Sequence, residues 1–528
     1  MSAGMSSEFH IPQKLTLAHK VFFAVMGLLI AVEVYLGYLA HGMGDADLYI
    51  WGYFMRDLSS GSFNWQDWTL PASGYLFPCL ASYSLCWVFC LGNSVLALVL
   101  QMILYAWTFA ILLKSVLRRL LGWDRPDSWL AALGLTLILA NTQTISWGLE
   151  QGLLLPQSHG GATLVMLLGI LVLHSYWRKG RARTLIALGI LTALGSFGDK
   201  IFILWFVGGA GLIALIHRRW TLMGTLVVST ALGATLVWWI TPTASAVYMP
   251  NGNWRLIAEN TSLRGLPAFW RDLRAGGASF NMCMVALVGT VIGGLSLWKN
   301  RRKLPWWSWG AIWIAAVPLA ISIIAQTYES PDNWRHFPFT LLIPLVLLLA
   351  ALKQISHHWK AVFICASLGL LAIELLYFVR QNGAFSDLYT GPFRIIYRGL
   401  PQPKTIDDIE FIHSQLHLKD GLATYWISKQ VTLQSKDGVF LAPIWRDGRI
   451  VPCMTTLRDF EAHHFNYVLT DNLITSQIIS HFGPPQKILE VIRKKDRYRI
   501  LVYPDGFLDK ALAHDETLLQ IKKDRHLQ

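Results

Sequence analysis

Two carboxylates lie two residues apart in the segment HGMGDADLYI, directly after the first long apolar run of the chain. Asp45 and Asp47 are followed by a row of aromatic residues that begins at Tyr49. A carboxylate in a half-buried, aromatic-lined pocket can remove a proton from a hydroxyl or an amine, and it can also bind a divalent metal ion. Both acids could instead be solvated loop residues, with Asp45 capping a helix that begins at Ala46. The pair is the first candidate for a catalytic site, with Tyr49 lining it.

Two cations on distant segments are candidates for binding a phosphate. Lys200 lies in GSFGDKIF and Arg335 lies in SPDNWRHFPF, each beside an apolar run. A lysine acts on a phosphate as a point charge, whereas the guanidinium fork of an arginine can hold it through two parallel hydrogen bonds. Lys200 could instead form a structural ion pair with Asp199, because a charge between apolar helices is costly unless it is paired or faces water. Arg335 could instead bind lipid headgroups.

Three more polar residues are candidates for lining the same site. Glu150 lies in the predicted outer segment 142–158, His159 directly follows that segment, and His336 directly follows Arg335. A histidine in a loop is more often incidental than a ligand. We nevertheless expect all three at the same face of the protein as the acidic pair.

The composition is that of an integral membrane protein. Of the 528 residues, 54% are hydrophobic and only 15% are charged, and the mean hydropathy is +0.41. A soluble protein has about a quarter of its residues charged. The net charge of +13 could suggest a nucleic-acid partner. The basic residues, however, gather in short loops between apolar runs, which the positive-inside rule explains, and we expect no nucleic-acid binding.

The apolar runs predict about eleven transmembrane helices with the N-terminus in the cytoplasm. The basic loops then all fall on one side of the membrane. A short run at 76–90 is expected to pack on the outer face or to re-enter the membrane. The predicted spans are 21–40, 94–113, 129–141, 162–177, two short helices within 184–216, 221–240, 281–298, 307–325, 339–352 and 361–378. The two short helices are expected to meet on the outer side at a polar centre, residues 196–200.

The chain changes character after residue 380, which divides it into a membrane domain, 1–380, and a C-terminal domain, 381–528. The second part is polar, with short stretches typical of strands at 438–445, 465–471 and 498–504. About 140 residues are enough for an independent core. We expect a small α/β domain on the outer, extracytoplasmic side.

Four motifs give the chain a resemblance to the GT-C superfamily of polytopic glycosyltransferases. GDADLY opens the first outer loop, and FPCLASYSLCWVF leads into a helix that ends in basic residues. GSFGDKIFILWF is similar to the glycine-rich turn of the family, and NWRHFPFTLLIPLVLLLA is similar to its late arginine-aromatic-proline helix opening. The likeness covers about residues 15–380. Its nearest counterparts are the protein O-mannosyltransferases and the aminoarabinose transferases.

The resemblance implies a glycosyltransferase that moves a sugar from a polyprenyl-phosphate donor to an extracytoplasmic acceptor. The acceptor would be lipopolysaccharide or O-antigen, another cell-envelope glycan, a lipid or a protein. Asp45 or Asp47 would be the base, Lys200 and Arg335 would neutralise the carrier phosphate, and a divalent metal ion is an optional cofactor. The chain has DAD where many relatives have Asp-Glu or a single Asp. We slightly prefer Asp45, which lies closer to the end of the first helix.

The implied location is the inner membrane of a bacterium, with the C-terminal domain in the periplasm or outside the cell. Two other functions stay open. A flippase for a lipid-linked sugar would have internal repeats and broken helices in corresponding halves. An O-antigen polymerase or ligase would depend on a large outer loop rich in arginine, and the segment 241–277 carries Arg255, Arg264, Arg271 and Arg274.

Overall fold

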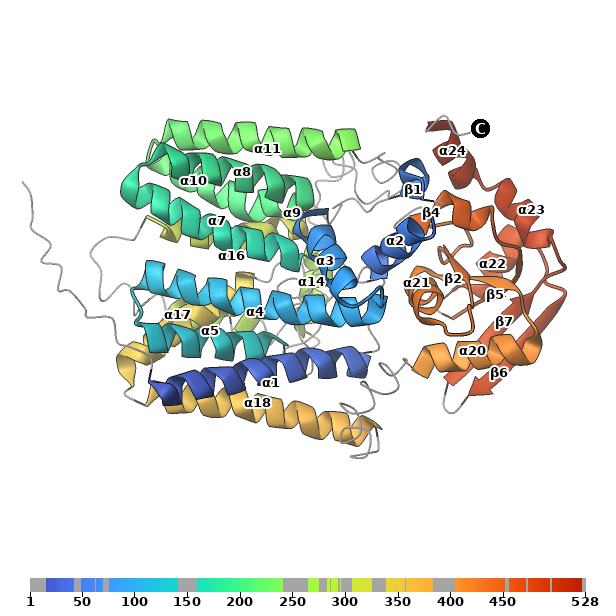
Figure 1. Ribbon diagram of the computed structural model, residues 1–528, viewed down its shortest axis with the longest axis horizontal. Coiled ribbons are helices and arrows are strands. Elements are labelled where there is room, and N and C mark those ends of the chain that lie inside the picture. The colour runs from blue at the N-terminus through green and yellow to red at the C-terminus, as the bar shows by residue number, and fades with distance from the viewer. Residues whose placement is uncertain are drawn as a thin grey trace, which may run out of the picture.

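The protein has a helical part and a C-terminal part that contains a sheet, joined by a junction formed by α2 (Ile50–Ser59), β1 (Trp68–Thr69) and β4 (Thr455–Thr456) (Figure 1). This arrangement comes from a computed structural model. It describes residues 16–41, 49–61, 63–69, 76–140, 159–240, 265–274, 283–284, 286–292, 295, 306–324, 339–356, 358–382, 404–451, 455–471, 473–493 and 496–524.

Long apolar helices make up the helical part. Among the described residues, four of them contain segments long and apolar enough to cross a membrane, namely Leu17–Val34, Ser94–Leu121, Gly160–Lys179 and Trp220–Val237. The chain is thus a mostly helical membrane protein, while the expected eleven spans stay a prediction. The main helices are α1 (Leu17–His41), α4 (Ser94–Leu121), α5 (Arg125–Ala140), α7 (Gly160–Lys179), α8 (Ala182–Gly198), α10 (Gly208–Ile216), α11 (Trp220–Ile240), α16 (Ser308–Ile324), α17 (Phe339–Ile355) and α18 (Trp359–Asn382).

Local signals explain where these helices begin and end. The side chain of Asn93 caps α4 by accepting a hydrogen bond from the amide of Leu96 at 2.9 Å. Gly122 and Gly180 follow α4 and α7 in the left-handed conformation that ends many helices. Both helices have basic residues in the last turn, where a positive charge complements the helix dipole.

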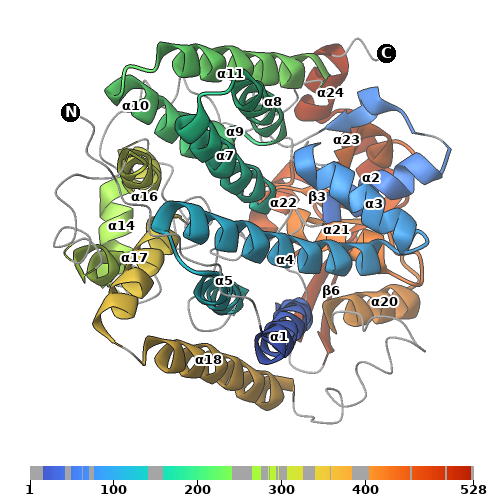
Figure 2. The ribbon, with the colours of Figure 1, turned by 60° about the vertical axis from the view of Figure 1, so that its left-hand side comes forward.

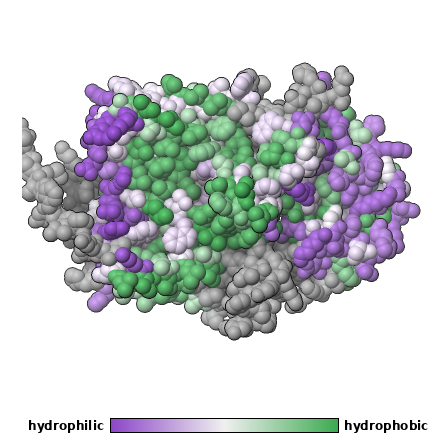
Figure 3. Space-filling model, in the orientation of Figure 1, coloured by the Kyte–Doolittle hydropathy of each residue, from purple (hydrophilic) through white to green (hydrophobic). Residues whose placement is uncertain are grey.

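The basic connections of the helical part share one end of the molecule. The α4–α5, α7–α8, α10–α11 and α17–α18 connections lie at the end opposite the C-terminal sheet (Figure 1). Asp127 at the start of α5 joins two of these connections, because its carboxylate lies 2.6 Å from the ammonium groups of both Lys353 and Lys360. Between that end and the C-terminal part, the visible face of the helices is a broad hydrophobic surface (Figure 3). This pattern is what a membrane-embedded bundle requires.

Some helices pack against their neighbours in sequence, and others pack against helices that are distant in the chain. α1 lies against α4 and α5, α7 against α4 and α8, α8 against α11, and α10 against α16. Figure 2 gives the same arrangement from another side. A short irregular segment, η3 (Leu76–Leu80), and α3 (Ala81–Phe89) occupy the place of the predicted short run, and η3 contacts both α7 and α8.

The C-terminal part is built on a five-stranded sheet with the order β3-β2-β5-β7-β6. β2 runs parallel to β3 and β5, whereas β7 runs antiparallel to β5 and β6. Three strands fall in the stretches that the sequence predicts. The elements are α20 (Lys404–Leu416), β2 (Asp420–Thr424), α21 (Tyr425–Gln434), β3 (Leu441–Ile444), β5 (Phe465–Leu469), α22 (Thr475–Phe482), β6 (Lys487–Arg493), β7 (Asp496–Val502), α23 (Phe507–Ala513) and α24 (Glu516–Asp524).

The segment after the first helix is fastened to this C-terminal part. β1 (Trp68–Thr69) pairs antiparallel with β4 (Thr455–Thr456), and α2 (Ile50–Ser59) packs against α21. The Tyr53 hydroxyl donates a hydrogen bond to the buried carboxylate of Asp459. A guanidinium nitrogen of Arg56 donates to the carbonyl of Thr432 at 2.6 Å.

A second set of contacts closes the junction. Arg458 forms an ion pair with Asp57, whose other carboxylate oxygen accepts a hydrogen bond from the Trp68 indole at 2.7 Å. The ring of Phe54 meets those of Trp51 and Trp68 edge to face. The aromatic residues after the acidic pair were expected to line a pocket or the membrane interface. Those on α2 instead form the buried core of the junction.

The Asp459 carboxyl gives the junction a pH dependence that can be measured. Burial raises the pKa of Asp459 above its usual value of 3.8, and the ammonium of Lys429 is the largest opposing influence. Since the pKa is higher in the folded state than in the unfolded state, the contribution of this group is fully present below about pH 4. It is lost as the pH rises through the folded-state pKa.

We therefore expect wild type to gain stability relative to Asp459→Asn as the pH falls from about 7 to about 4. Thermal unfolding of both purified proteins in detergent measures the difference in melting temperature at each pH. A difference that stays constant over that range contradicts the interpretation.

Candidate functional site

The structure describes three of the predicted site residues. Lys200 and His159 lie close together in the helical part, and Tyr49 is buried directly before α2. The other five predicted residues lie outside the described residues, so their positions stay predictions. They are Asp45, Asp47, Glu150, Arg335 and His336.

His159 and Asp199 form a buried pair at one end of the helical part. The Nδ1 atom of His159 lies 2.6 Å from a carboxylate oxygen of Asp199, and each residue is 3% exposed. The other carboxylate oxygen accepts a hydrogen bond from the amide of Ile201 at 3.0 Å. Asp199 thus ends α8, caps the short α9 (Lys200–Phe202) and orients the imidazole.

The backbone at His159 is held in an unusual conformation. Its φ angle is 119°, in a region that side-chain-bearing residues rarely adopt. His159 is also the residue that precedes the first turn of α7. Backbone strain of this kind persists where the surroundings fix it, and it is common at functional sites. The Asp199 carboxylate is one such constraint.

Lys200 is exposed and follows this buried pair directly. No ion pair joins Lys200 to Asp199, so the structural ion pair that was the alternative interpretation is absent, and the two oxygens of Asp199 bind His159 and the Ile201 amide. The ammonium group is therefore available to an anion that approaches the break between α8 and α9.

The His159–Asp199 pair and Lys200 together form what we call the corner of the helical part. The start of α17 reaches this corner through two aromatic contacts. The rings of His159 and Trp205 lie 6.0 Å apart, and those of Trp205 and Phe339 lie 5.0 Å apart, both edge to face. Phe339 is the first residue of α17 and follows Arg335 by four positions. Three of the segments that carry predicted site residues therefore meet: the start of α7, the α8–α9 break and the start of α17.

Close backbone contacts hold the α8–α9 break against η3. A Cβ atom built on Gly198 would lie 1.9 Å from the carbonyl oxygen of Phe77. At the start of α7, a Cβ on Gly161 would lie 2.6 Å from the sulfur of Cys79. Only glycine allows these two approaches.

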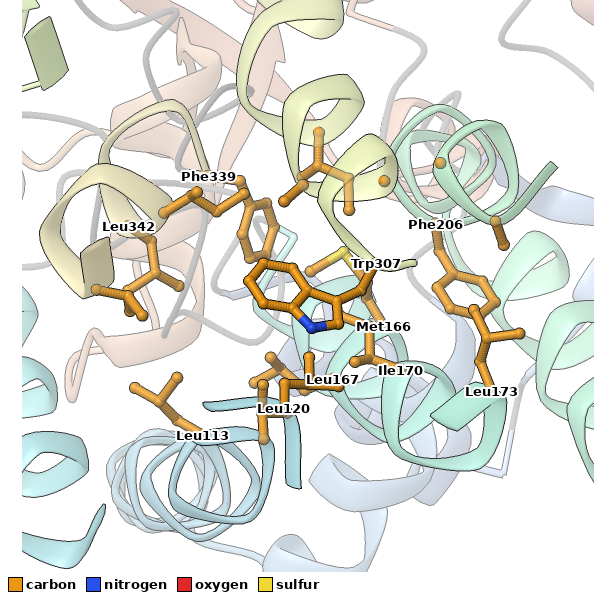
Figure 4. Close-up of a pocket in the computed structure, with 18 of the residues that line it drawn as sticks. Leu113, Leu120, Met166, Leu167, Ile170, Leu173, Phe206, Trp307, Phe339 and Leu342 are labelled. Carbon is orange, nitrogen blue, oxygen red and sulfur yellow. The ribbon is translucent and has the colours of Figure 1, made fainter. Parts of the chain in front are cut away.

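An apolar cavity of about 140 Å³ begins beside this corner. Phe339 belongs to its wall, and the Trp307 indole lies among the aliphatic side chains that surround it (Figure 4). The cavity extends along α7 from Met166 to Leu173, about two helical turns. The remaining described wall comes from α4, α10, α16, α17, Phe206, Trp306 and Trp307, with α4 supplying Leu113, Val116, Leu117, Leu120 and Leu121.

An aromatic stack lies at the opposite end of the cavity. Trp306 lines the cavity and stacks on Trp177 with ring centres 4.8 Å apart. The ring of His174 also stacks on the Trp306 indole, with ring centres 6.1 Å apart, and the guanidinium of Arg219 lies over the Trp177 ring. These residues are at the basic end of the helices, so the described wall of the cavity includes residues from the neighbourhood of both ends.

Two features of the corner were not predicted from the sequence. His159 pairs with Asp199, and Trp205 contacts both His159 and Phe339. Forty positions separate the pair, and no periodicity links a loop histidine to a helix break. The polar centre at residues 196–200 was the one available signal, and it drew attention to Lys200. For the metal ion, no group of three or more ligating side chains occurs among the described residues.

The comparisons with known proteins add no family. No protein-family model matches the chain, and no curated protein is similar to it. The arrangement of the corner itself must therefore carry any functional conclusion.

The contact between Gly198 and Phe77 gives a prediction about how this corner is held together. Gly198→Ala places a methyl group against a backbone carbonyl that cannot rotate away, and overpacking of this kind destabilises by about 1–3 kcal/mol or more. Gly224→Ala on α11 is the matched control, because a Cβ there meets nothing within 4 Å. We expect it to stay within about 1 kcal/mol of wild type. Thermal unfolding in detergent measures both, and equal melting temperatures contradict the packing described for Gly198.

Proposed function

We propose that the chain is a membrane glycosyltransferase. It moves a sugar from a polyprenyl-phosphate donor to a glycan, lipid or protein acceptor on the extracytoplasmic side. The observation that carries the proposal is the meeting of an apolar cavity with a polar corner that presents Lys200 beside the His159–Asp199 pair. In a substrate with a hydrocarbon chain and an anionic head, the chain fits the apolar cavity and the head fits the polar corner.

The apolar cavity supports a lipid-linked substrate on grounds of size and chemistry. Every described residue in its wall is apolar, aromatic or glycine. An apolar cavity of about 150 Å³ in another protein stays dry and takes up benzene. A cavity of similar volume has room for a short length of isoprenoid chain.

The polar corner supports an anionic head. Lys200 supplies a positive charge at the α8–α9 break, and Arg335 lies four residues before Phe339, which packs into the same corner. In the proposed reaction these two cations hold the carrier phosphate. They stabilise the negative charge that grows on it as it leaves.

The reaction follows from these assignments. Asp45 or Asp47 removes a proton from the acceptor hydroxyl or amine while that atom attacks the anomeric carbon of the donor. The bond between the anomeric carbon and the phosphate oxygen breaks, and its electron pair leaves with the polyprenyl phosphate. Displacement from the opposite face inverts the anomeric configuration. His159, oriented by Asp199, acts as a positioning residue beside the leaving phosphate.

The proposed location is the bacterial inner membrane, with the N-terminus in the cytoplasm and the C-terminal part in the periplasm or outside the cell. The gathering of the basic connections at the end opposite the C-terminal sheet supports this orientation. The positive-inside rule assigns such an end to the cytoplasm.

The acidic pair gives the most direct test. We expect Asp45→Ala or Asp47→Ala to abolish sugar transfer in purified enzyme with labelled polyprenyl-phosphate sugars, because the acceptor loses its base. The conservative Asp→Asn variant of the same residue keeps the shape and should be equally inactive. Wild-type rates in both alanine variants rule out the assignment. If the protein moves the donor across vesicle membranes without forming a glycosidic bond, it acts as a flippase.

Lys200 provides a second test, directed at the donor. We expect Lys200→Ala to reduce transfer about ten- to hundred-fold, since a hydrogen bond to a charged group is worth about 1.5–3 kcal/mol. Lys200→Arg should recover part of the activity because it keeps the charge. Lys436→Ala, an exposed lysine of the C-terminal part, is the control. Equal rates for Lys200→Ala and Lys436→Ala contradict a role for Lys200 in binding phosphate.

A further inference from the structure

A polar pocket lies in the junction between the helical part and the C-terminal part. Its volume is about 310 Å³, and none of its residues lines the apolar cavity. Ligand sites form preferentially where two parts of a protein meet. α2 contributes Arg56 and Ser59, α3 contributes Trp87, and the rest of the wall is Gly92, Asn93, Ser94, Val95, Leu433 and Gln434.

Close packing around Gly52 brings these elements together. A Cβ atom on Gly52 would lie 2.7 Å from a methyl carbon of Leu433 and 2.9 Å from the Tyr83 hydroxyl oxygen. That hydroxyl donates a hydrogen bond to the carbonyl of Ser94 at 2.8 Å. α2 is thereby fixed against α21 on one side and the start of α4 on the other.

The guanidinium of Arg56 is held in place at the edge of this pocket. It lies over the ring of Tyr53, 4.8 Å from the ring centre, and one of its nitrogens donates to the carbonyl of Thr432 at 2.6 Å. Tyr53 is itself fixed by Asp459. Arg56 is nevertheless exposed, so the other N–H groups of its planar fork can reach a ligand.

The residue types around the pocket favour a carbohydrate. Amide and hydroxyl groups come from Asn93, Gln434, Ser59 and Ser94, and no carboxylate occurs among the lining residues that the structure describes. The Asn93 oxygen caps α4 and the Ser59 hydroxyl donates to the Arg56 carbonyl at 2.8 Å, so a ligand would meet the NH2 group of Asn93 and the lone pairs of the Ser59 oxygen. Trp87 adds an aromatic ring, whose negative face attracts the weakly positive C–H groups of a sugar. Sugars combine such an apolar C–H face with a rim of hydroxyls, and Arg56 would also accept an acidic sugar.

The surface beside the pocket fits a site at the membrane surface. On α3 and the turn that follows it, Leu85, Val88, Phe89 and Leu91 are 58–96% exposed. Large apolar side chains at neighbouring positions are stabilised when a bilayer covers them. Trp87 belongs to the same helix, so the pocket lies next to the residues that we expect to enter the lipid.

We infer that this pocket binds a carbohydrate chain at the outer membrane surface, either free or carried on a lipid. The identification of the bound carbohydrate as the acceptor of the transferred sugar rests on the proposed function, whereas carbohydrate binding by the pocket does not. The pocket is separate from the corner formed by His159 and Lys200 and would hold the glycan from the side of the C-terminal part.

The test uses the full chain in lipid nanodiscs and measures binding without transfer. A printed array of neutral and acidic bacterial oligosaccharides selects the best-bound glycan. Its dissociation constant is then measured free in solution and coupled to a lipid. Ser59→Tyr fills the pocket with an aromatic side chain from an exposed position, and Ser60→Tyr places the same side chain one residue further on, outside the wall.

We expect Ser59→Tyr to abolish glycan binding and Ser60→Tyr to leave it unchanged. Arg56→Lys, which keeps the charge and loses the fork, should weaken binding about ten-fold. Arg497→Lys on β7 is its control and should have no effect. A preference for the free or for the lipid-coupled glycan identifies the source of the ligand, and either supports the inference.

The inference is overturned if no glycan binds in either form, or if Ser59→Tyr binds as tightly as Ser60→Tyr. Both outcomes are independent of catalysis. Full transfer activity in the Asp45 and Asp47 variants would remove the proposed function and leave the binding result in place.

Discussion

The hydrogen bond between Asp199 and His159 is the interaction on which the corner of the helical part depends. A carboxylate among apolar helices costs several kcal/mol unless it is paired or faces water. Asp199 meets that requirement with one oxygen on the imidazole and the other on the Ile201 amide. The same pair sets where α8 stops and orients the side chain that precedes α7. Without it, the buried carboxylate of Asp199 would keep an unsatisfied charge at the break between two apolar helices.

The features predicted correctly from the sequence are those that depend on local hydrophobicity. The apolar runs at 94–113, 162–177 and 221–240 correspond to α4, α7 and α11. Their lengths follow from the bilayer, which acts on each helix separately. The polar centre at 196–200 indicated the break at Asp199, and stretches rich in β-branched and aromatic residues indicated β3, β5 and β7.

The features that sequence reasoning missed depend on residues far apart in the chain. Trp51 and Phe54 look like pocket-lining or interfacial residues when only their neighbours are considered. Their burial comes from the junction, in which Tyr53 contacts Asp459 across 406 positions. His159 likewise has nothing in its own loop that indicates Asp199. Such partners are chosen by the packing of whole elements, which leaves no periodic trace in the sequence.

The pairing of β1 with β4 also has a consequence for how the protein is made. The Thr69 hydroxyl donates a hydrogen bond to the carbonyl of Thr455, 386 positions later. At a synthesis rate of about 5–20 residues per second, roughly 20–80 s pass before the partner strand exists. During that interval α1 can already lie in the bilayer while the aromatic face of α2 has nothing to cover it. One of the first segments to leave the ribosome is thus among the last to reach its final contacts, and the nascent chain needs lipid or a chaperone to shield it until then.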